Sequence, residues 1–209
     1  MKKLIVATVA TLATMGCAAQ DIALPKVDMN QKSTTMIETL AKRHSVRSYS
    51  NQQLSAQELS NLCWAACGVS RDANHRTAPT AMNRREIRLF VFNSEGAYEY
   101  IAPENRLKSV VKGDNRALFA TSQAFVKEAP VILLMVLDFD IFGRRDEHTM
   151  TMGCVDVGNV SENINLYCQS VGLCTVPRAM MDKDAISKLL GLGENQIPLI
   201  NNPVGYPKK

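Results

Sequence analysis

The sequence is short of several kinds of residue, and each shortage excludes a class of protein. Only 6% of its 209 residues are aromatic and 21% are charged, while 46% are hydrophobic. This balance excludes a disordered or collagen-like chain. The formal charge of +4 falls to +2 (4 − 2) without Lys2 and Lys3, the only charged residues among the first nineteen. So small a positive excess does not favour binding to nucleic acid.

The sequence also lacks an apolar run of the ~20 residues that a membrane-spanning helix needs. Its first apolar stretch, residues 4–15, follows two lysines and precedes the small-residue sequence Cys17-Ala18-Ala19. These are the features of a cleaved signal peptide, so we expect residues 1–19 to direct export to the periplasm. In the alternative interpretation Gly16-Cys17 is a lipobox and Cys17 anchors an exported lipoprotein, although Thr14 stands where an aliphatic residue is usual.

Cysteines are few and odd in number once residues 1–19 are set aside. The remaining ones are Cys63, Cys67, Cys154, Cys168 and Cys174. Exported proteins held by disulfides normally contain an even number, so we expect no disulfide framework. Cys63 and Cys67 are four residues apart in an apolar helical pattern, which suits small buried side chains better than the C-x-x-C pairs of zinc sites. We therefore expect no metal site.

Familiar catalytic signatures are missing as well. The sequence contains no G-x-S-x-G, H-E-x-x-H, P-loop or G-x-G-x-x-G motif. Its three histidines, His44, His75 and His148, lie in unrelated segments. A hydrolase built on a cysteine–histidine pair stays open as an alternative, although no cysteine lies in an obviously electropositive segment that would lower its pKa.

Hydrophobic periodicity predicts one domain of residues 36–209, preceded by a polar N-terminal arm of residues 20–35. We expect helices over residues 36–42, 55–67, 115–128, 153–171 and 182–190. We expect strands over residues 87–93, 98–101, 130–137 and 199–204, the first two as a hairpin. Because helices and strands do not alternate regularly, the pattern favours an α+β fold over a doubly wound sheet.

Three polar segments between these elements carry candidate binding chemistry. In an extended backbone Arg43, Ser45 and Arg47 face one way, and two guanidinium groups with a hydroxyl suit a phosphate. The alternative is a solvated basic stretch. In the second segment, residues 76–83, small side chains would let a planar ligand lie against the backbone, or would simply make a tight connection. The third, residues 172–179, leaves a helix with backbone amides free to donate hydrogen bonds.

Taken together in this order, the segments resemble the nitroreductase family of FMN-dependent flavoproteins, from about residue 33 to residue 207. Arg43-x-Ser45-x-Arg47 is similar to the family's N-terminal phosphate motif. Pro79-Thr80-Ala81-x-Asn83 is similar to its P-[ST]-[AS]-x-N loop. The other motifs that match are Asp156-x-Gly158 with Glu162-Asn163, Gly172-Leu173 with Val176-Pro177, and Pro203-Val204-Gly205-Tyr206-Pro207.

The resemblance implies a fold, a cofactor and an assembly. The fold would be α+β with a central mixed β-sheet flanked by helices, in an intertwined homodimer with two FMN sites at its interface. Arg43 and Ser45, with His44 between them, would hold the phosphate, and Arg47 would reach the pyrimidine side of the ring. Asn83 would hydrogen-bond the isoalloxazine. The further contacts would come from Pro79, Thr80, Ala81, Pro177, Arg178 and Ala179 around the ring, and from Lys208 or Lys209 at the phosphate.

The resemblance also implies an activity. The protein would be an FMN-dependent oxidoreductase that passes a hydride from NAD(P)H or another donor to a nitroaromatic, quinone or similar acceptor by a ping-pong mechanism. No catalytic side chain is assigned, because the chemistry belongs to the flavin. The alternatives are a flavin-dependent dehydrogenase or oxidase acting on a peptide or small molecule, a non-catalytic flavin-binding protein, and an anion-binding module without flavin. Arg84-Arg85-Glu86 replaces the Gln-Pro that often follows the asparagine, which leaves the substrate open.

Overall fold

The centre of the molecule is β5 (Val131–Asp138), a strand in which every residue is buried. The computed structural model describes residues 20–208, so the expected signal peptide with Cys17 lies outside the described residues. β5 belongs to a seven-stranded sheet of order β1-β4-β3-β2-β5-β7-β6. The α+β fold is confirmed; the resemblance implied a mixed sheet, and each strand pair within residues 20–208 is antiparallel.

The other strands flank β5 on both sides. They are β1 (Ile22–Ala23), β2 (Ile87–Phe92), β3 (Gly96–Ile101), β4 (Arg106–Lys112), β6 (Cys174–Thr175) and β7 (Gln196–Gly205). The predicted hairpin is β2–β3, and the Asn93 side chain closes its turn by accepting from the amides of Glu95 and Gly96. β1 comes from the N-terminal arm and pairs Ile22 with Leu107 at the sheet edge.

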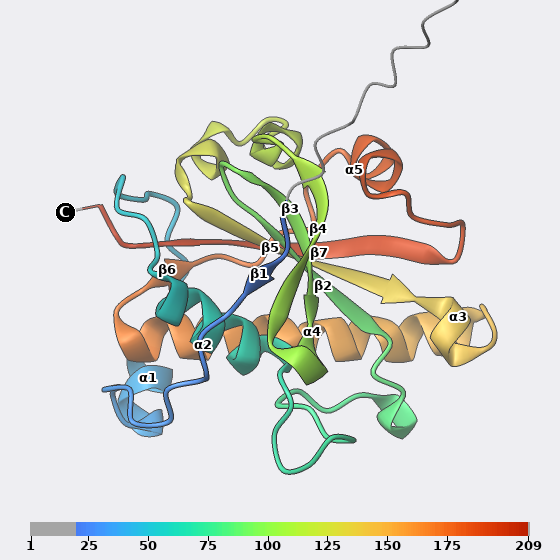
Figure 1. Ribbon diagram of the computed structural model, residues 1–209, viewed down its shortest axis with the longest axis horizontal. Helices are drawn as coiled ribbons and strands as arrows, with labels where there is room; N and C mark the ends of the chain where they lie inside the picture. Colours follow the sequence, from blue (N-terminus) through green and yellow to red (C-terminus); the bar gives the residue numbers. More distant parts are fainter. Residues whose placement is uncertain (1–19, 209) are drawn as a thin grey trace, which may run out of the picture.

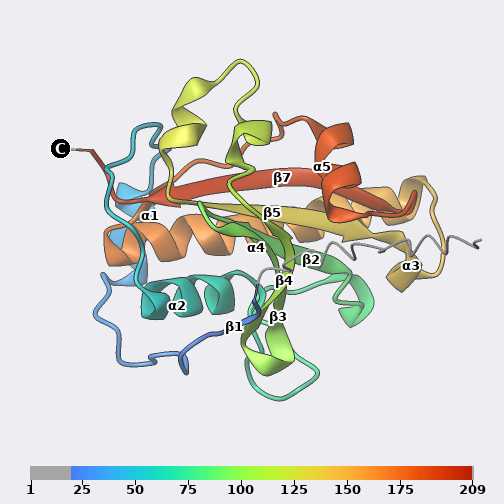
Figure 2. The same cartoon turned by 45° about the horizontal axis from the view of Figure 1, so that its top comes forward.

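Helices cover both faces of the sheet (Figure 1, Figure 2). On one face lie α1 (Met36–Lys42), α2 (Ala56–Cys67) and α4 (Glu147–Val171), and on the other α5 (Lys183–Leu190). Alternate residues of β5 serve the two faces: Leu133 and Met135 join the α2–α4 core, and Ile132 and Leu134 join the α5 core. The short α3 (Phe139–Phe142) follows β5 directly. Among the described helices, none is both long enough and apolar enough to cross a bilayer.

The long helix α4 begins earlier than the predicted residue 153. Asp146 caps it by accepting from the Thr149 amide at 2.8 Å, so the helix starts at Glu147. Gly153 instead lies inside the helix, where a Cβ would meet the Leu137 side chain at 2.4 Å. The glycine therefore allows α4 to approach β5 closely. The helix ends at Val171, as predicted, because Gly172 adopts φ 81°.

The helices predicted over residues 36–42, 55–67 and 182–190 are confirmed, with Ser55 and Asp182 as side-chain caps of α2 and α5. The helix predicted over residues 115–128 is wrong. That segment forms two short 3-10 helices, η3 (Arg116–Phe119) and η4 (Ala124–Glu128). Thr121, at φ 35°, interrupts the helical backbone between them. As a result, Phe119 and Val126 both pack in the α5 core.

Candidate functional site

The basic segment 43–47 leaves α1 and runs beside β6 and the end of β7. The Val46 amide donates to the Thr175 carbonyl at 3.1 Å. Tyr49 ties the segment to β7, because its hydroxyl donates to the carbonyls of Val46 (3.2 Å) and of Pro203 in β7 (3.3 Å). Burial holds the pKa of Tyr49 well above its usual value, so the phenol stays a donor. The segment is thus held by its backbone while its side chains remain available.

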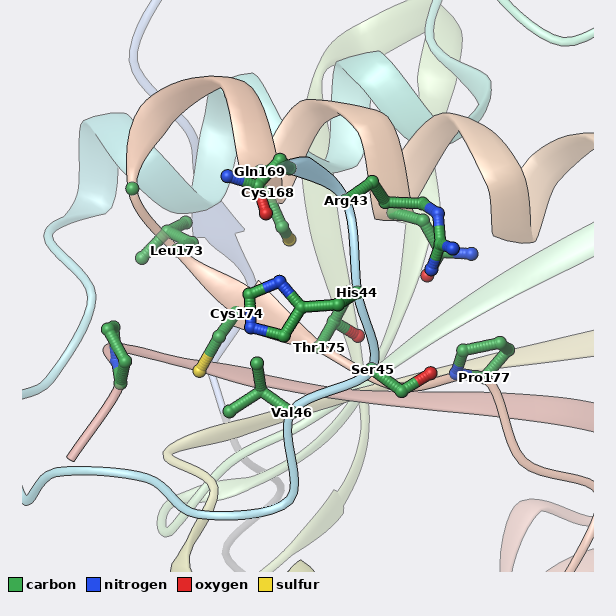
Figure 3. Close-up of a pocket in the computed structure, with 13 residues that line it drawn as sticks. Arg43, His44, Ser45, Val46, Cys168, Gln169, Leu173, Cys174, Thr175 and Pro177 are labelled. Atoms are coloured by element: carbon green, nitrogen blue, oxygen red, sulfur yellow. The ribbon is translucent and has the colours of Figure 1, made fainter. Parts of the chain in front are cut away.

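Segment 43–47 forms one wall of a cavity of about 160 Å³, here called the Arg43 cavity. The opposite wall comes from the end of α4 and the turn after it (Figure 3). The guanidinium of Arg43 and the hydroxyl of Ser45 extend to the same side, toward Pro177, while the His44 ring points the other way. The predicted alternation is therefore present for Arg43 and Ser45, whereas Arg47, predicted to face the same way, does not line the cavity. The lining residues are Arg43, His44, Ser45, Val46, Asn165, Cys168, Gln169, Gly172, Leu173, Cys174, Thr175, Pro177 and Pro207.

The Arg43 cavity has positive charge and no balancing carboxylate among its lining residues. The sequence has no Asp or Glu over residues 39–57 or 195–209, which supply two of its edges. Lys208 is exposed directly after the lining residue Pro207; Lys209 lies outside the described residues. Arg47 is exposed but is not part of the lining; its charge lies near Arg178, whose pKa is lowered by burial and by Arg47. This arrangement suits an anion such as a phosphate.

The two cysteines of the cavity are not activated. Burial raises the pKa of the Cys174 thiol to about 11 and that of Cys168 well above its usual value. The Sγ atom of Cys174 lies 3.9 Å from the Ser48 carbonyl. A neutral buried thiol is a weak nucleophile, which argues against the cysteine–histidine hydrolase. Within the described residues all five cysteines are free, and no group of three or more metal-binding side chains converges.

The predicted loop Pro79–Asn83 lies elsewhere in the same chain. The Ala81 amide donates to the Asp156 carboxylate at 2.7 Å, which places the loop at the middle of α4. Asp156 and the cavity residue Cys168 are 12 residues apart (168 − 156), or about 18 Å along the helix. Pro79, Thr80 and Asn83 instead line a wide, open hollow of about 530 Å³. One chain therefore does not bring segments 43–47 and 79–83 into one cavity.

Two buried carboxyl groups lie beneath this loop. Glu86 is 0% and Asp156 4% exposed. Burial and the neighbouring Asp156 raise the pKa of Glu86 to about 8. Both oxygens of Glu86 lack a hydrogen-bond partner among the described residues. Glu86 is consequently neutral at pH 7, and Asp156 holds the loop through the Ala81 amide.

The third predicted segment alternates between surface and interior. Pro177 and Ala179 are exposed, whereas Arg178 is buried. The Arg178 guanidinium donates to Gln123 Oε1 (2.7 Å), Asn201 Oδ1 (2.9 Å) and the Phe119 carbonyl (3.0 Å). Its side chain thus supports the turn from inside, and Pro177 is the residue of the three that lines the Arg43 cavity.

Three lining residues on α4 were not found from the sequence. Asn165, Cys168 and Gln169 follow the i, i+3, i+4 spacing of one helix face, which was the available signal. Asn165 is fixed by Asn202 of β7, whose amide nitrogen donates to Asn165 Oδ1 at 3.0 Å and to Thr175 Oγ1 at 3.2 Å. This buried amide joins α4, β6 and β7 beneath the cavity.

Comparison with known proteins shows what the whole chain is similar to. The nitroreductase family model matches residues 40–206. A Methanocaldococcus jannaschii protein provisionally named a nitroreductase is 29% identical over 198 residues, covering 88% of this chain and 96% of that protein. A Ralstonia eutropha crystal structure with the same provisional name has a TM-score of 0.84 at 28% identity, covering 93% of this chain and 92% of the other. The NADPH:FMN oxidoreductase of Vibrio harveyi, solved with NAD+, shares the fold with a TM-score of 0.64 at 20% identity. The match covers 83% of this chain and 69% of the other.

Proposed function

Since the chain belongs to the nitroreductase family, we propose that it is an FMN-dependent oxidoreductase. It would take a hydride from NAD(P)H or another donor and reduce a nitroaromatic, a quinone or a similar small acceptor. The observation that carries the proposal is the Arg43 cavity, where Arg43, His44 and Ser45 meet the end of α4 and no lining residue is a carboxylate.

The residues of the Arg43 cavity fit the phosphate end of FMN. A guanidinium and a hydroxyl on one side of an extended segment offer several donors to a phosphate, and the exposed Lys208 directly follows the lining residue Pro207. The cavity volume of about 160 Å³ is below the ~300–1,000 Å³ of typical ligand sites. The ring of the cofactor would therefore lie outside this cavity, beyond Pro177.

We propose that a second copy of the chain completes the site. Segment 79–83 opens into a different hollow from the Arg43 cavity, so it would serve the cofactor held by the partner. An apolar surface is available for such an interface: Met36, Ile37 and Leu40 of α1 and Val155 of α4 are each more than half exposed. The assembly would be a homodimer with two sites.

When bound, FMN would supply the hydride transfer. Arg43 and Ser45 would hold the phosphate, and Pro177 would shield the ring from water. Arg47, whose charge no carboxylate pairs among the described residues, would favour negative charge at the pyrimidine edge. The lining of the Arg43 cavity contains no acid–base pair and no ionised thiol, so this chain would bind and orient rather than transfer protons itself.

The test is the flavin content of the purified protein and its dependence on Arg43. We expect the absorbance of bound FMN, and a loss of affinity of about ten- to a hundredfold in Arg43→Ala, because a charge-assisted contact contributes ~1.5–3 kcal/mol. Lys42→Ala is the matched control, since Lys42 is the adjacent exposed cation outside the cavity lining. Equal FMN affinity of Arg43→Ala and wild type in a dialysis titration would remove the assignment, and absence of any FMN binding would favour the anion-binding module.

Export is a separate part of the proposal. Residues 1–19 would be removed and the enzyme would act in the periplasm, where its donor would differ from the chiefly cytoplasmic NAD(P)H. Mass spectrometry of the mature N-terminus decides between a chain that starts at Gln20 and one acylated at Cys17; an intact Met1 in the mature protein contradicts both.

A further inference from the structure

A second cavity lies beside the β2–β3 hairpin, apart from the Arg43 cavity; it shares Arg76, Ala78 and Thr80 with the hollow lined by segment 79–83. Its volume is about 200 Å³ and we call it the hairpin cavity. Most of its wall is hydrocarbon, from Ile87, Leu89, Ile101, Ala102, Pro103 and Val160. Its charged groups are Arg76, Arg85, Arg88 and Glu99.

The charges of the hairpin cavity do not balance. Arg88 is neutralised, because its Nε donates to Glu99 Oε1 at 2.7 Å and its Nη1 lies 3.7 Å from Asp138 Oδ2. Arg76 and Arg85, in contrast, form no ion pair within residues 20–208. Two positive charges are thus left facing the cavity.

Both unpaired arginines line the hairpin cavity. Arg76 donates through Nη1 to the carbonyls of Ala73 (3.1 Å) and His75 (3.3 Å), which leaves its Nε and Nη2 free to bind. The Arg85 amide donates to Thr80 Oγ1 at 2.9 Å, which fixes the backbone from which the second guanidinium projects. Burial and the charge of Arg85 lower the pKa of Arg76, which reflects the repulsion between them.

Other titratable groups at this place do not supply the missing negative charge. The Tyr100 hydroxyl donates to Asn105 at 3.0 Å, and burial raises its pKa above the usual value. Burial raises the pKa of Cys67 to about 12 and that of Glu86, next to Arg85 in the chain, to about 8. All three are neutral at pH 7, so none of them pairs with the charge of Arg76 or Arg85.

We propose that the hairpin cavity binds a small carboxylate with a compact hydrocarbon body. The carboxylate would lie between the guanidinium groups of Arg76 and Arg85, which match its two oxygens. The body would cover the apolar wall formed by Ile87, Ile101 and Val160. That wall favours a hydrocarbon acid over inorganic phosphate, which has no apolar part.

The probe is cyclohexanecarboxylate, added to the full-length protein in the presence and in the absence of FMN and followed by methyl NMR. We expect saturable shifts at Ile87, Ile101 and Val160, with little change at Val46 in the Arg43 cavity. The neutral cyclohexanecarboxamide, and acetate, which lacks the ring, are each expected to bind at least about tenfold more weakly than cyclohexanecarboxylate. Shifts confined to the Arg43 cavity, equal binding of the amide, or inorganic phosphate binding as tightly would each overturn the proposal.

Arg85→Asn tests the site, and Arg84→Asn is its control. Asparagine tolerates the left-handed backbone of Arg85 (φ 59°), while Arg84 is an equally exposed neighbour outside the cavity. Arg85→Asn is expected to lower the affinity for cyclohexanecarboxylate about tenfold and to leave the affinity for FMN unchanged. Arg84→Asn is expected to leave both affinities unchanged. Undiminished binding to Arg85→Asn, or an equal loss in Arg84→Asn, rejects the assignment. The experiment gives its answer whether or not the protein holds FMN, so its outcome is separate from that of the proposed function.

Discussion

Among single residues, the buried carboxyl group of Glu86 has a direct consequence for stability. Its pKa rises from 4.5 to about 8 on folding, because it is buried beside Asp156. Between these values the folded protein binds more protons than the unfolded chain does. The free energy of unfolding therefore falls as pH rises through this window.

Glu86→Gln is expected to remove this pH dependence. The amide resembles the protonated acid and cannot ionise. The unfolding free energies of wild type and variant should therefore differ least near pH 4.5. As pH approaches 8, the free energy of unfolding of the variant should rise relative to that of wild type. Denaturant unfolding at several pH values measures this difference. Glu95→Gln, an exposed carboxylate in the next turn, serves as control and should show no such trend. A constant difference between Glu86→Gln and wild type would mean that Glu86 is ionised in the folded protein.

Part of the lining of the Arg43 cavity was predicted residue by residue, namely Arg43, His44, Ser45 and Pro177, and the exceptions have physical reasons. Alternation in an extended backbone was enough to orient Arg43 and Ser45. Arg178 could not be recognised as buried, because its partners Gln123 and Asn201 are distant in the sequence. Asn165 was missed because it is a polar residue on a helix whose pattern suggested an apolar surface.

At the scale of elements, helix boundaries followed local chemistry. Thr35, Ser55 and Asp182 each accept a backbone hydrogen bond at the start of a helix, and such caps can be recognised in a sequence. β6 could not be foreseen, since a strand of two residues exists only through its pairing with β7. The interruption of the predicted helix at Thr121 is likewise set by the packing of Phe119 and Val126 in the α5 core. Helix propensity, which depends on neighbouring residues alone, cannot predict this packing.

The contact between α4 and β5 supplies a prediction at this scale. A Cβ on Gly153 would lie 2.4 Å and 2.6 Å from the Cδ atoms of Leu137, which is itself fully buried. Gly153→Ala should therefore lose about 1–3 kcal/mol of unfolding free energy through overpacking, although alanine favours helices. Gly193→Ala, in an exposed loop with open space around its Cβ, should change it by no more than ~0.5 kcal/mol. A gain of stability in Gly153→Ala would show that the helix can move away without cost.

At the scale of the whole molecule, the separation of segments 43–47 and 79–83 bears on assembly. We expect light scattering to give about twice the 23.0 kDa chain mass, less the residues removed on export. Val155→Glu should shift the protein toward monomer, because it places a charge on a side chain that is 54% exposed on α4. Ile141→Glu, at an apolar residue that is 39% exposed on α3 rather than on α4, is the control. A Val155→Glu protein that stays dimeric would exclude this helix face from the interface.

The hydrogen bond from Tyr49 to Pro203 joins residues 154 positions apart, and it has a consequence for how the protein is made. During synthesis the segment with Arg43 leaves the ribosome long before the strand that holds it in place. The Arg43 cavity therefore cannot form on the nascent chain until β7 has emerged and paired with β5. A cofactor that binds there can stabilise only the finished protein, so flavin retention would report that the last strand has been incorporated.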